Sequence, residues 1–251
     1  MNVIETLAAH RTKRQFSTQA VTDAALNALV AAAQQMPTSQ YLQAYSLIEI
    51  TDPAKRAAVA KITTMPTVAA NGRLLIVLAD QHRNLALAPG ADQRRALSEM
   101  DRFLGSVEDA TLVTAALLLA AESQGLGSVV LGSINNDTQA VIDLLGLPEL
   151  TLPVFGLQIG HPLDQPEKKP RLGLPAVLFK NTYQEPQTYQ SELTAFDQRL
   201  HAYYQARSSH ARDEHLAHMT NEALGSAARR RDFFKVARRQ GFFPEATPTH
   251  N

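Results

Sequence analysis

The stretch NGRLLIVLAD, from Asn71 to Asp80, sets the arrangement expected for the rest of the chain. Its first two residues, Asn-Gly, favour a turn, and Leu74 to Ala79 then forms a continuous apolar run. A strand that is apolar at every position needs cover on both faces of its sheet, because successive side chains point to opposite faces. The stretch therefore predicts a buried strand between layers of other elements.

Strands and helices alternate on both sides of this stretch. Strands are predicted within residues 45–51, 125–133 and 151–162, and helices over 1–9, 21–35, 52–62, 105–124 and 135–148. Thr22 and Asp52 are expected N-caps, and Asn135, Asn136 or Asp137 caps the last of these helices. The helix over 105–124 is apolar nearly all round, which places it in the centre of the fold. The alternation predicts an α/β or α+β protein with a sheet wrapped by helices.

Composition excludes several classes of function. The chain has 251 residues with 24 Lys and Arg against 24 Asp and Glu, so no global field attracts DNA or anionic lipid. It has no cysteine, which excludes a thiolate nucleophile, a zinc–thiolate site and a disulfide, and fits a reducing cytoplasm. No signal peptide is visible, and the longest apolar stretch, Leu112 to Ala121, is about half of a membrane span. We expect a soluble, cytoplasmic protein that binds no membrane.

The composition changes after about residue 190. Residues 191–207 show a polar amphipathic pattern, and residues 207–240 hold eight Lys or Arg against four acids. Basic residues interleaved with Phe233 and Phe234 have two interpretations: a helix that packs on a partner, or a segment that binds nucleic acid. We favour packing and expect no nucleic-acid partner. The last residues, 244–251, are expected to be disordered.

Motifs for phosphate, metal or nucleophilic chemistry are absent. GLGSVVLG, from Gly125 to Gly132, superficially resembles a dinucleotide fingerprint, but its third glycine comes too late and the run precedes a strand. The eight histidines show no metal-ligand spacing, so we expect no metal and no catalytic side chain. A bound cofactor would then carry the chemistry.

Two basic clusters contain the groups that a phosphate requires. His10, Arg11, Thr12 and Arg14 follow the first helix, and EKKPR, Glu167 to Arg171, follows the last strand. Guanidinium groups pair with phosphate oxygens in a bidentate manner, and a hydroxyl adds a neutral donor. Taken singly, each cluster has a second interpretation as a solvated stretch of charged surface without a ligand.

The sequence around both clusters resembles the flavin-dependent nitroreductase family, specifically its NADPH-dependent group of major oxygen-insensitive nitroreductases and flavin reductases. HRTKRQFS, beginning at His10, is similar to the family's H-R-S-x-R-x-F, and AAESQGLGSVVLGSINN resembles AAESLGLGGVYIGGLRNN. LPVFGLQIGHPLDQPEKKPRLGLP resembles LPLFGLCLGWPxxxPxxKPRLP. Further matches at SQYLQAYSLIEITD, YYQARSS and RRQGF extend the resemblance over nearly the whole chain. Several motifs in register favour the phosphate interpretation of both clusters.

The resemblance implies a fold, an assembly and a cofactor. The implied fold is α+β, with a central mixed, mainly antiparallel sheet wrapped by helices, in an intertwined homodimer. Residues 1–251 would form a single domain, whose helical arm from about 190 to 240 clasps the partner subunit. FMN would bind at the dimer interface, so that each active site needs two chains.

The resemblance also places the FMN contacts on particular residues. The phosphate contacts would be His10, Thr12, Lys169 and Arg171, with Arg11 close by. Arg14 would face the pyrimidine edge of the flavin, where a cation favours the reduced ring. The backbone from Val130 through Leu131 and Gly132 to Ser133 would approach the ring, and Ser39, Gln40 and Leu42 would come from the other subunit. Lys13 is expected to point into solvent.

Three positions depart from the family's pattern. Thr12 stands where the family has serine, and Ser133 replaces a second glycine. Met65 stands where relatives often have a glutamine that bonds the flavin, so Met65 is a candidate ring contact. Tyr41 and Phe103 are aromatic side chains that either stack on the flavin or pack in the core.

The implied activity is hydride transfer from NADPH, through flavin N5, to nitroaromatics, quinones or free flavin by a ping-pong mechanism. Arg207, Arg212 and Arg230 match arginines credited with NADPH selectivity in this group. A dedicated NAD(P)H:flavin reductase is the alternative among enzymes, and a polyanion-binding regulator is the alternative outside them. The sequence leaves open the physiological acceptor and the preference between NADPH and NADH.

Overall fold

The computed structural model describes residues 2–226, 230 and 232–244, and the chain divides into two compact units. The first unit comprises Met1–Gln165 and Arg230–Asn251, and the second comprises Pro166–Arg229. Most of the tail for which disorder is predicted, residues 245–251, lies outside the described residues. The predicted single domain with a clasping arm stays a prediction, and each unit is described below by itself.

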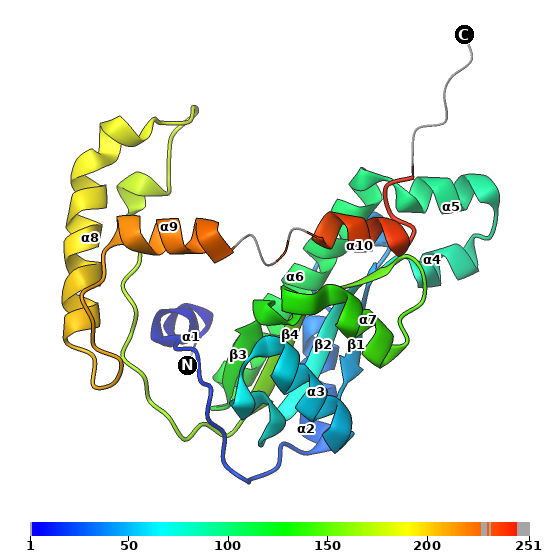
Figure 1. The fold of residues 1–251 in the computed structure, drawn as a ribbon, viewed down its shortest axis with the longest axis horizontal. Helices are drawn as coiled ribbons and strands as arrows, with labels where there is room; N and C mark the ends of the chain where they lie inside the picture. Colours follow the sequence, from blue (N-terminus) through cyan, green and yellow to red (C-terminus); the bar gives the residue numbers. More distant parts are fainter. Residues whose placement is uncertain (1, 227–229, 231, 245–251) are drawn as a thin grey trace. The chain divides into compact units, whose positions relative to one another are not determined.

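A four-stranded antiparallel sheet forms the centre of the first unit (Figure 1). The strand order is β1 (Tyr45–Glu49), β2 (Arg73–Asp80), β4 (Thr151–Gly160) and β3 (Gly127–Leu131). All three neighbouring pairs are antiparallel, and a register shift between Val77 and Leu78 interrupts the β2–β4 ladder. This arrangement confirms the predicted α+β fold with an antiparallel sheet. Among the described residues, no strand pair of the sheet is parallel.

Strand β2 is buried on both faces, as its apolar run predicts. Leu74, Ile76 and Leu78 join one hydrophobic cluster, whereas Leu75 and Val77 join another. Because alternate side chains of a strand point to opposite faces, the two clusters lie on the two sides of the sheet. The sequence NGRLLIVLAD therefore supplies both halves of the core.

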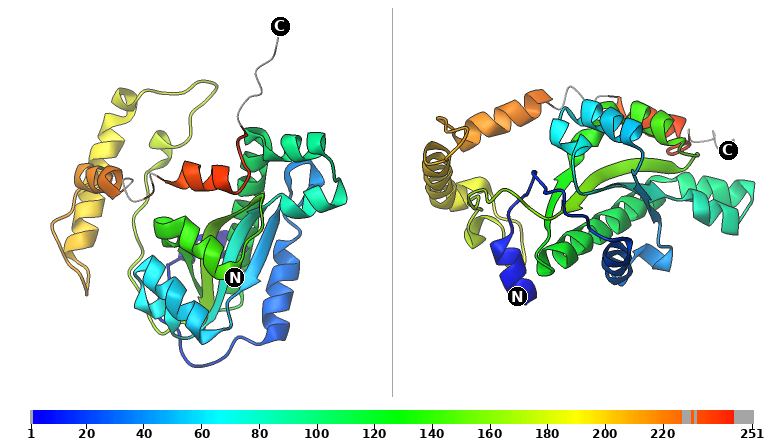
Figure 2. Two further views of the ribbon diagram at one scale, coloured as in Figure 1. Left: turned by 45° about the vertical axis from the view of Figure 1, so that its right-hand side comes forward. Right: turned by 90° about the horizontal axis from the view of Figure 1, so that it is seen from below.

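Helices cover both faces of this sheet (Figure 2). One face packs against α2 (Asp23–Ala33) and α6 (Met100–Ser123), whose Leu29, Val113 and Leu117 are buried with β2 and β4 side chains. The other face packs against helices that contribute Val59, Val141 and Val236 to the cluster around Leu74, Ile76 and Leu78. These helices are α3 (Pro53–Thr63), α7 (Thr138–Leu145) and α10 (Phe233–Arg239).

Helix α6 has the length and the apolar composition of a membrane-crossing segment. Its Ala110, Val113, Leu117 and Ala121 are almost completely buried in the cluster beneath the sheet. A helix that is surrounded by other elements needs apolar residues on several faces. Its place in the core accounts for the composition without a membrane.

Local capping signals fix the starts of three helices where the sequence places them. The side chains of Thr22, Asp52 and Asp137 accept backbone N–H groups at the starts of α2, α3 and α7. Gly146 ends α7 in the left-handed region, with φ at 61°. Asp137 is thus the cap among the three candidates.

The region between β2 and α6 is more helical than the sequence analysis predicts. It contains α4 (His82–Leu87) and α5 (Ala91–Ser98), and α6 begins at Met100 rather than near Gly105. Because the first turn of α6 is polar and exposed at Asp101, the apolar pattern that reveals the helix begins several residues after its start.

The first unit also contains a helix near its start and short 3₁₀ turns. Helix α1 (Val3–Ala9) is present as predicted, with Ile4 and Leu7 exposed. The turns are η1 (Ser39–Tyr41), η2 (Pro66–Ala69) and η3 (Gly132–Asp137). Two of them, η1 and η3, contain predicted FMN contacts.

The second unit is built around two helices and a small aromatic core. Helix α8 (Gln190–Gln205) confirms the amphipathic helix predicted over 191–207, and α9 (Leu216–Ser226) follows a loop. The buried members of the core are Phe196, Leu200 and Tyr204. Two short 3₁₀ turns, η4 (Leu174–Ala176) and η5 (Pro186–Tyr189), precede these helices.

Candidate functional site

Residues 10–16 lie against two other parts of the first unit. The backbone N–H of Lys13 donates to the carbonyl of Ser128 at 2.9 Å, and Phe16 forms a bridge with Pro162. The backbone N–H of Arg14 donates to an Asp164 carboxylate oxygen at 3.3 Å. The first basic cluster is thereby held next to the start of β3 and the chain after β4.

His10 is oriented by a partly buried carboxylate. Its Nδ1 lies 2.8 Å from Glu122 Oε1, and the Ser128 hydroxyl donates to the same oxygen at 3.1 Å. The side chain of Glu122 is only 11% exposed, so the pair is protected from solvent. Because Nδ1 is engaged, Nε2 is the ring nitrogen that can meet an anion.

The prediction that Lys13 points into solvent is wrong. Its Nζ donates to the carbonyl of Asp164 at 2.7 Å, and the side chain is partly buried. A Cβ on Gly127 would lie 2.7 Å from Lys13 Cβ, so the lysine stem fills the space beside that glycine. Lys13 therefore fastens the segment, whereas Arg14 is the exposed cation of the pair.

The loop with Ser39, Gln40 and Leu42 is fixed by Asp109, an acid of α6 that is 1% exposed. Asp109 Oδ1 accepts the N–H of Ser39 at 2.7 Å, and Oδ2 accepts the N–H of Ala44 at 2.9 Å. Between these two anchors, Gln40, Tyr41 and Gln43 all have positive φ, at 51°, 60° and 48°.

Gln40, Tyr41 and Gln43 are not glycine, so a left-handed backbone conformation costs about 1–3 kcal/mol at each of them. The anchors at Asp109 supply the constraint that such a backbone requires. The approach of the loop to α6 is also close, because a Cβ on Gly105 would lie 2.9 Å from Ser39 Oγ. The Ser39 side chain is partly buried, and Tyr41 is 83% exposed.

The turn after β3 is open on its backbone side. Val130 is 38% exposed and Leu131 is buried, as strand alternation requires. At Gly132, an added Cβ would meet no atom within 4 Å, so a flat ligand can approach the backbone there. The Ser133 hydroxyl lies 3.9 Å from the Met65 sulfur, which places the candidate ring contact beside this turn.

Phe103 has a structural place in the core. Its ring makes edge-on contacts with Phe242 and Phe243, each at a centroid distance of 4.9 Å, and it is 8% exposed. Core packing is thus the correct alternative for Phe103. The other aromatic candidate, Tyr41, presents its ring to solvent in this chain.

The basic helix α10 also has a packing role. Val236 and Ala237 are buried in the cluster on the α3 side of the sheet, and Phe233 packs against that cluster. Phe234 stacks on Phe243 at 5.1 Å. These contacts lie within the chain's own first unit, whereas packing of this segment on a partner subunit stays a prediction.

In the second unit, Lys169 and Arg171 line one pocket of about 480 Å³. Lys168 and Arg199 also line it, so four cationic side chains border the same space, with Pro170 and Tyr203 as the other walls. The guanidinium of Arg171 folds back to the carbonyls of Lys169 and Pro170, at 3.2 and 3.1 Å. This basic pocket, as we call it below, has the donor set of a phosphate site.

Three predicted cations of the second unit gather around one buried ring. The guanidinium carbon of Arg212 lies 4.0 Å from the Tyr204 centroid, and Arg207 and Lys169 lie at 5.8 and 5.7 Å. The ring face attracts cations, and Tyr204 is 2% exposed. Arg207 Nε is enclosed and has no hydrogen-bond partner among the described residues.

Glu214 holds one of these cations in place, and Glu167 holds the chain next to Arg207. Arg212 Nε donates to Glu214 at 2.7 Å, a hydrogen bond that raises the pKa of Arg212. Glu167 accepts the N–H and the hydroxyl of Ser208, at 3.1 and 2.8 Å. Hydrogen bonds from its own backbone and from Ser208 lower the pKa of Glu167 to about 2.

Arg230, the third predicted NADPH contact, belongs to the first unit and is exposed.

Comparison with known proteins identifies the family of the chain. The model of the nitroreductase family matches residues 7–161, and the model of that family's C-terminal domain matches residues 169–245. The chain belongs to the nitroreductase family. The two matched regions contain the first basic cluster and Lys169 to Arg171 of the second, and the resemblance found in the sequence motifs is confirmed.

Several nitroreductases and flavin reductases are similar to this family member over most of their length. An FMN reductase (NADPH) of Bacillus subtilis is 36% identical over 85% of this chain and 87% of the relative. An oxygen-insensitive NADPH nitroreductase of Salmonella typhimurium is 39% identical over 83% and 85%. The structure of the NfrA1 nitroreductase from B. subtilis superposes with a TM-score of 0.91 at 33% identity, covering 96% of this chain and 99% of that one.

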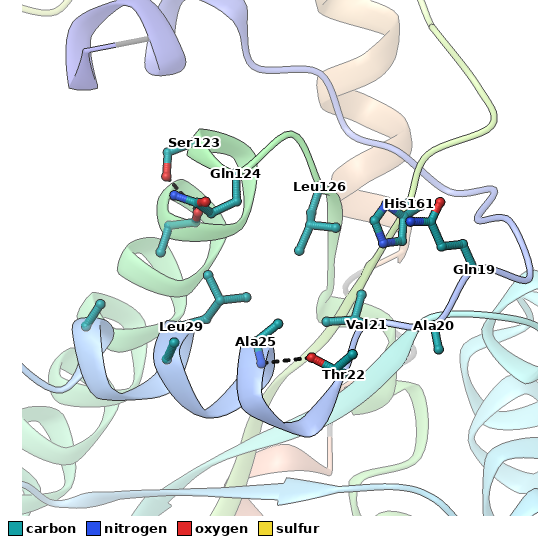
Figure 3. A pocket seen from close by; sticks show the side chains of 13 residues that line it. Gln19, Ala20, Val21, Thr22, Ala25, Leu29, Ser123, Gln124, Leu126 and His161 are labelled. Carbon is teal, nitrogen blue, oxygen red and sulfur yellow. Dashed lines mark hydrogen bonds between the residues drawn. The ribbon is translucent and has the colours of Figure 1, made fainter.

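The first unit also has an apolar pocket of about 670 Å³ (Figure 3). Side chains of α2, of the end of α6 and of Leu126 line it, together with His161. None of the predicted FMN or NADPH contacts lines this pocket. Its volume exceeds that of the basic pocket, but its mostly apolar wall lacks the cations that a phosphate needs.

Some residues that support the candidate site escape prediction from the sequence. Arg199 borders the basic pocket, Glu122 orients His10, and Asp109 anchors the Ser39 loop. Asp109 carries a signal that could reveal it, because an acid on the buried face of a largely apolar helix requires a partner. Glu122 lies within the AAESQGLG motif, but nothing local pairs it with a histidine 112 residues away.

Proposed function

We propose that this chain is an FMN-dependent oxidoreductase that takes hydride from NADPH and passes it to nitroaromatics, quinones or free flavin in a ping-pong sequence. Membership of the nitroreductase family supports NADPH-driven, flavin-dependent reduction, as do the names of the two relatives. The observation that carries the proposal is the basic pocket, in which Lys169 and Arg171 share one space with Lys168 and Arg199.

The residues present fit an FMN phosphate. Lys169 and Arg171 offer cationic donors in the basic pocket, and Lys168 and Arg199 add charge to its border. His10 offers Nε2, because Glu122 occupies Nδ1. Thr12 keeps the family's hydroxyl, and Arg11 adds a further cation beside it. Guanidinium, ammonium, imidazole and hydroxyl donors together match the three oxygens of a phosphate monoester.

The open turn after β3 fits a flat ring. The backbone from Val130 through Leu131 and Gly132 to Ser133 would lie against the flavin, because nothing occupies the space beside Gly132. Met65 would contact the ring next to Ser133 and would offer a sulfur where relatives offer an amide. Arg14 would face the pyrimidine edge, where its exposed guanidinium stabilises negative charge. When bound, FMN supplies the hydride chemistry, so no side chain has to act as a nucleophile.

Assembly completes the site in this proposal. A homodimer would bring Ser39, Gln40 and Leu42 of one chain to the flavin of the other, on a loop that Asp109 already holds in shape. The arm from about 190 to 240 would clasp the partner subunit. Each active site would therefore contain two chains in a cytoplasmic enzyme.

NADPH would meet the cations around Tyr204. Arg207 and Arg212 flank one face of the second unit's core, and the enclosed Nε of Arg207 still has a hydrogen bond to offer. These arginines and Arg230 suit a phosphate group of a dinucleotide. Small planar acceptors would follow NADPH into the same space after the nucleotide has left.

Purification and steady-state kinetics test the proposed function. We expect a yellow protein that releases FMN on denaturation, and parallel double-reciprocal plots when NADPH is varied at several acceptor concentrations. A colourless protein that binds no added FMN would overturn the proposal, and intersecting plots would overturn the ping-pong order.

A dedicated flavin reductase is separated from a nitroreductase by the choice of acceptor. We expect NADPH to support the reduction of nitrofurazone, menadione and FMN at comparable kcat/KM. A value for FMN more than a hundredfold above the other two would instead indicate a dedicated flavin reductase. The same assay with NADH measures the nucleotide preference.

A further inference from the structure

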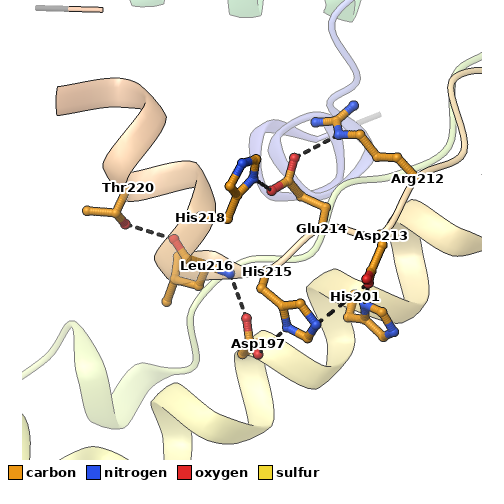
Figure 4. A network of polar contacts seen from close by, with 9 residues as sticks. All are labelled: Asp197, His201, Arg212, Asp213, Glu214, His215, Leu216, His218 and Thr220. Carbon is orange, nitrogen blue, oxygen red and sulfur yellow. Dashed lines mark hydrogen bonds and ion pairs between the residues drawn. The ribbon is translucent and has the colours of Figure 1, made fainter. Parts of the chain in front are cut away.

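Three potential metal ligands from separate segments meet in the second unit (Figure 4). His201 lies on α8, and Asp213 and His215 lie in the loop before α9. One ligand atom from each residue lies within 4.8 Å of the other two. Sequence spacing does not reveal the group, because the helix and the loop come together only in the folded unit.

The distances are close to those that a small divalent ion imposes. Asp213 Oδ1 lies 3.1 Å from His201 Nδ1 and 3.7 Å from His215 Nε2. A tetrahedral zinc ion with bonds of about 2.0–2.1 Å keeps its ligand atoms about 3.3 Å apart. Small side-chain movements would bring all three atoms onto one ion.

A second carboxylate orients His215 in the manner of a metal ligand. His215 Nδ1 lies 2.8 Å from Asp197 Oδ2, and Asp197 Oδ1 accepts the N–H of Leu216 at 2.6 Å. The proton on Nδ1 is therefore directed at Asp197, which leaves the lone pair of Nε2 on the side of Asp213. Metal-bound histidines commonly donate their other ring N–H to a carboxylate in this way.

His201 has an enclosed nitrogen that lacks a hydrogen bond. Its Nδ1 is buried and has no hydrogen-bond partner among the described residues, although Asp213 lies nearby. The His201 and His215 rings stack at 4.5 Å with an interplanar angle of 13°. His215 is 49% exposed, so its ring has room to tilt until both lone pairs point at a shared ion.

The local charge favours a cation. Asp197 and Asp213 contribute two negative charges, and the neighbouring Arg212 is paired with Glu214. Two imidazoles and one carboxylate suit zinc, nickel or copper better than magnesium or calcium.

We propose that His201, Asp213 and His215 bind a divalent transition metal ion such as Zn²⁺, with Asp197 as the residue that positions His215. The ion fastens the loop before α9 to helix α8 and keeps a remaining coordination position for water. It requires neither FMN nor NADPH, so its presence is independent of the proposed function.

Calorimetric titration of the tag-free, full-length protein with ZnCl₂, after dialysis against EDTA and then metal-free buffer, tests the site. We expect one Zn²⁺ per chain with a micromolar dissociation constant. His215→Ala and Asp213→Asn should each weaken binding at least tenfold, and Asp197→Asn should weaken it about tenfold. FMN content is measured before and after the titration and should not change.

Matched controls separate this site from other histidines of the loop. His210→Ala removes an exposed histidine three residues before Asp213 and should leave the Zn²⁺ affinity unchanged. His218→Ala removes the partner of Glu214 and should also leave it unchanged. Wild-type protein that binds no Zn²⁺, or His215→Ala protein of normal melting temperature that binds it as wild type does, would overturn the proposal.

Discussion

The first unit buries apolar side chains on both faces of a sheet, whereas the described part of the second unit buries only Phe196, Leu200 and Tyr204 in its cluster. Around those three, the second unit relies on pairs of charges, among them Arg199 with Glu192 and Arg212 with Glu214. Burial of apolar area contributes about 25 cal/mol per Å², but an exposed ion pair contributes only about 0–1 kcal/mol.

This difference teaches how stability is distributed along the chain. The two clusters of the first unit should unfold as one cooperative body, because they share the strands of a single sheet. The second unit should open at lower free energy, as regions with few buried apolar contacts do. The proposed ligands FMN and NADPH would meet cations of this less stable unit.

The largest expected effect comes from Ile76→Ala in β2, where the side chain is completely buried. It should lower the free energy of unfolding by about 2–5 kcal/mol, measured by urea denaturation. The matched change Leu200→Ala in α8 should leave the main urea transition nearly in place and instead speed proteolysis within residues 166–229. Equal shifts of the main transition in both variants would break the comparison.

Asp109 is an exception within the apolar first unit, since it is a buried carboxylate with two backbone donors. Asp109→Asn puts an amide N–H against one of these donors and should cost about 1–3 kcal/mol of unfolding free energy. The exposed Asp101→Asn on the same helix is the control and should cost almost nothing. If the two variants melt alike, the loop does not depend on the Asp109 anchor.

Glu122 is a second acid of functional interest in that unit, and it is partly buried. Glu122→Gln should weaken FMN binding about tenfold, or ~1.4 kcal/mol, because His10 loses the charge that orients it. Riboflavin lacks the phosphate, so its affinity should not change in the variant. Fluorescence titration with both flavins measures the effect, and equal losses for the two would remove Glu122 from phosphate recognition.

Lys13 and Arg14 are neighbours with different expected effects. Lys13→Ala should lower the unfolding free energy by about 0.5–1.5 kcal/mol through the lost hydrogen bond to Asp164. Arg14→Ala should leave stability unchanged and lower FMN affinity and activity. Lys13→Met keeps the packed stem beside Gly127 and should recover part of the stability. Thermal melts and flavin titrations of the three variants decide the assignment, and the reverse pattern would contradict it.

The smallest expected effect concerns the charge pairs of the second unit. A hydrogen bond to Glu214 raises the pKa of His218 above 6.5, and the same bond lowers the pKa of Glu214 below 4.5. The contribution of the pair is therefore complete between about pH 4.5 and 6.5. It is lost as the pH rises through the raised His218 value or falls through the lowered Glu214 value.

Glu214→Gln isolates this pair. In an NMR titration of the His218 ring, the wild-type pKa should lie above 6.5, and the pKa in the variant should return towards that value. The measurement is made in EDTA so that bound metal does not compete with protons. An unchanged His218 titration in the variant would show that Glu214 does not hold this histidine.

Much of the fold follows from local sequence. The run at Leu74 to Ala79 predicts a strand with cover on both faces, and Thr22 and Asp52 mark two helix starts. These features depend on neighbours in the chain, either through side-chain alternation or through a cap a few residues away. The helices between β2 and α6 escape prediction because their patterns are short and polar.

The candidate site also has a part that sequence predicts and a part that it does not. The charge of HRTKRQFS and EKKPR and their resemblance to the nitroreductase family make the cofactor class predictable from sequence. The sequence by itself thus determined the central strand, two helix caps and the family, and it predicts which cations would meet a phosphate. Only the tertiary structure decided that Lys13 fastens the chain, that Glu122 orients His10, and that His201 meets Asp213 and His215. The physical reason is that side-chain partners distant in sequence are chosen by packing, and no local pattern encodes that choice.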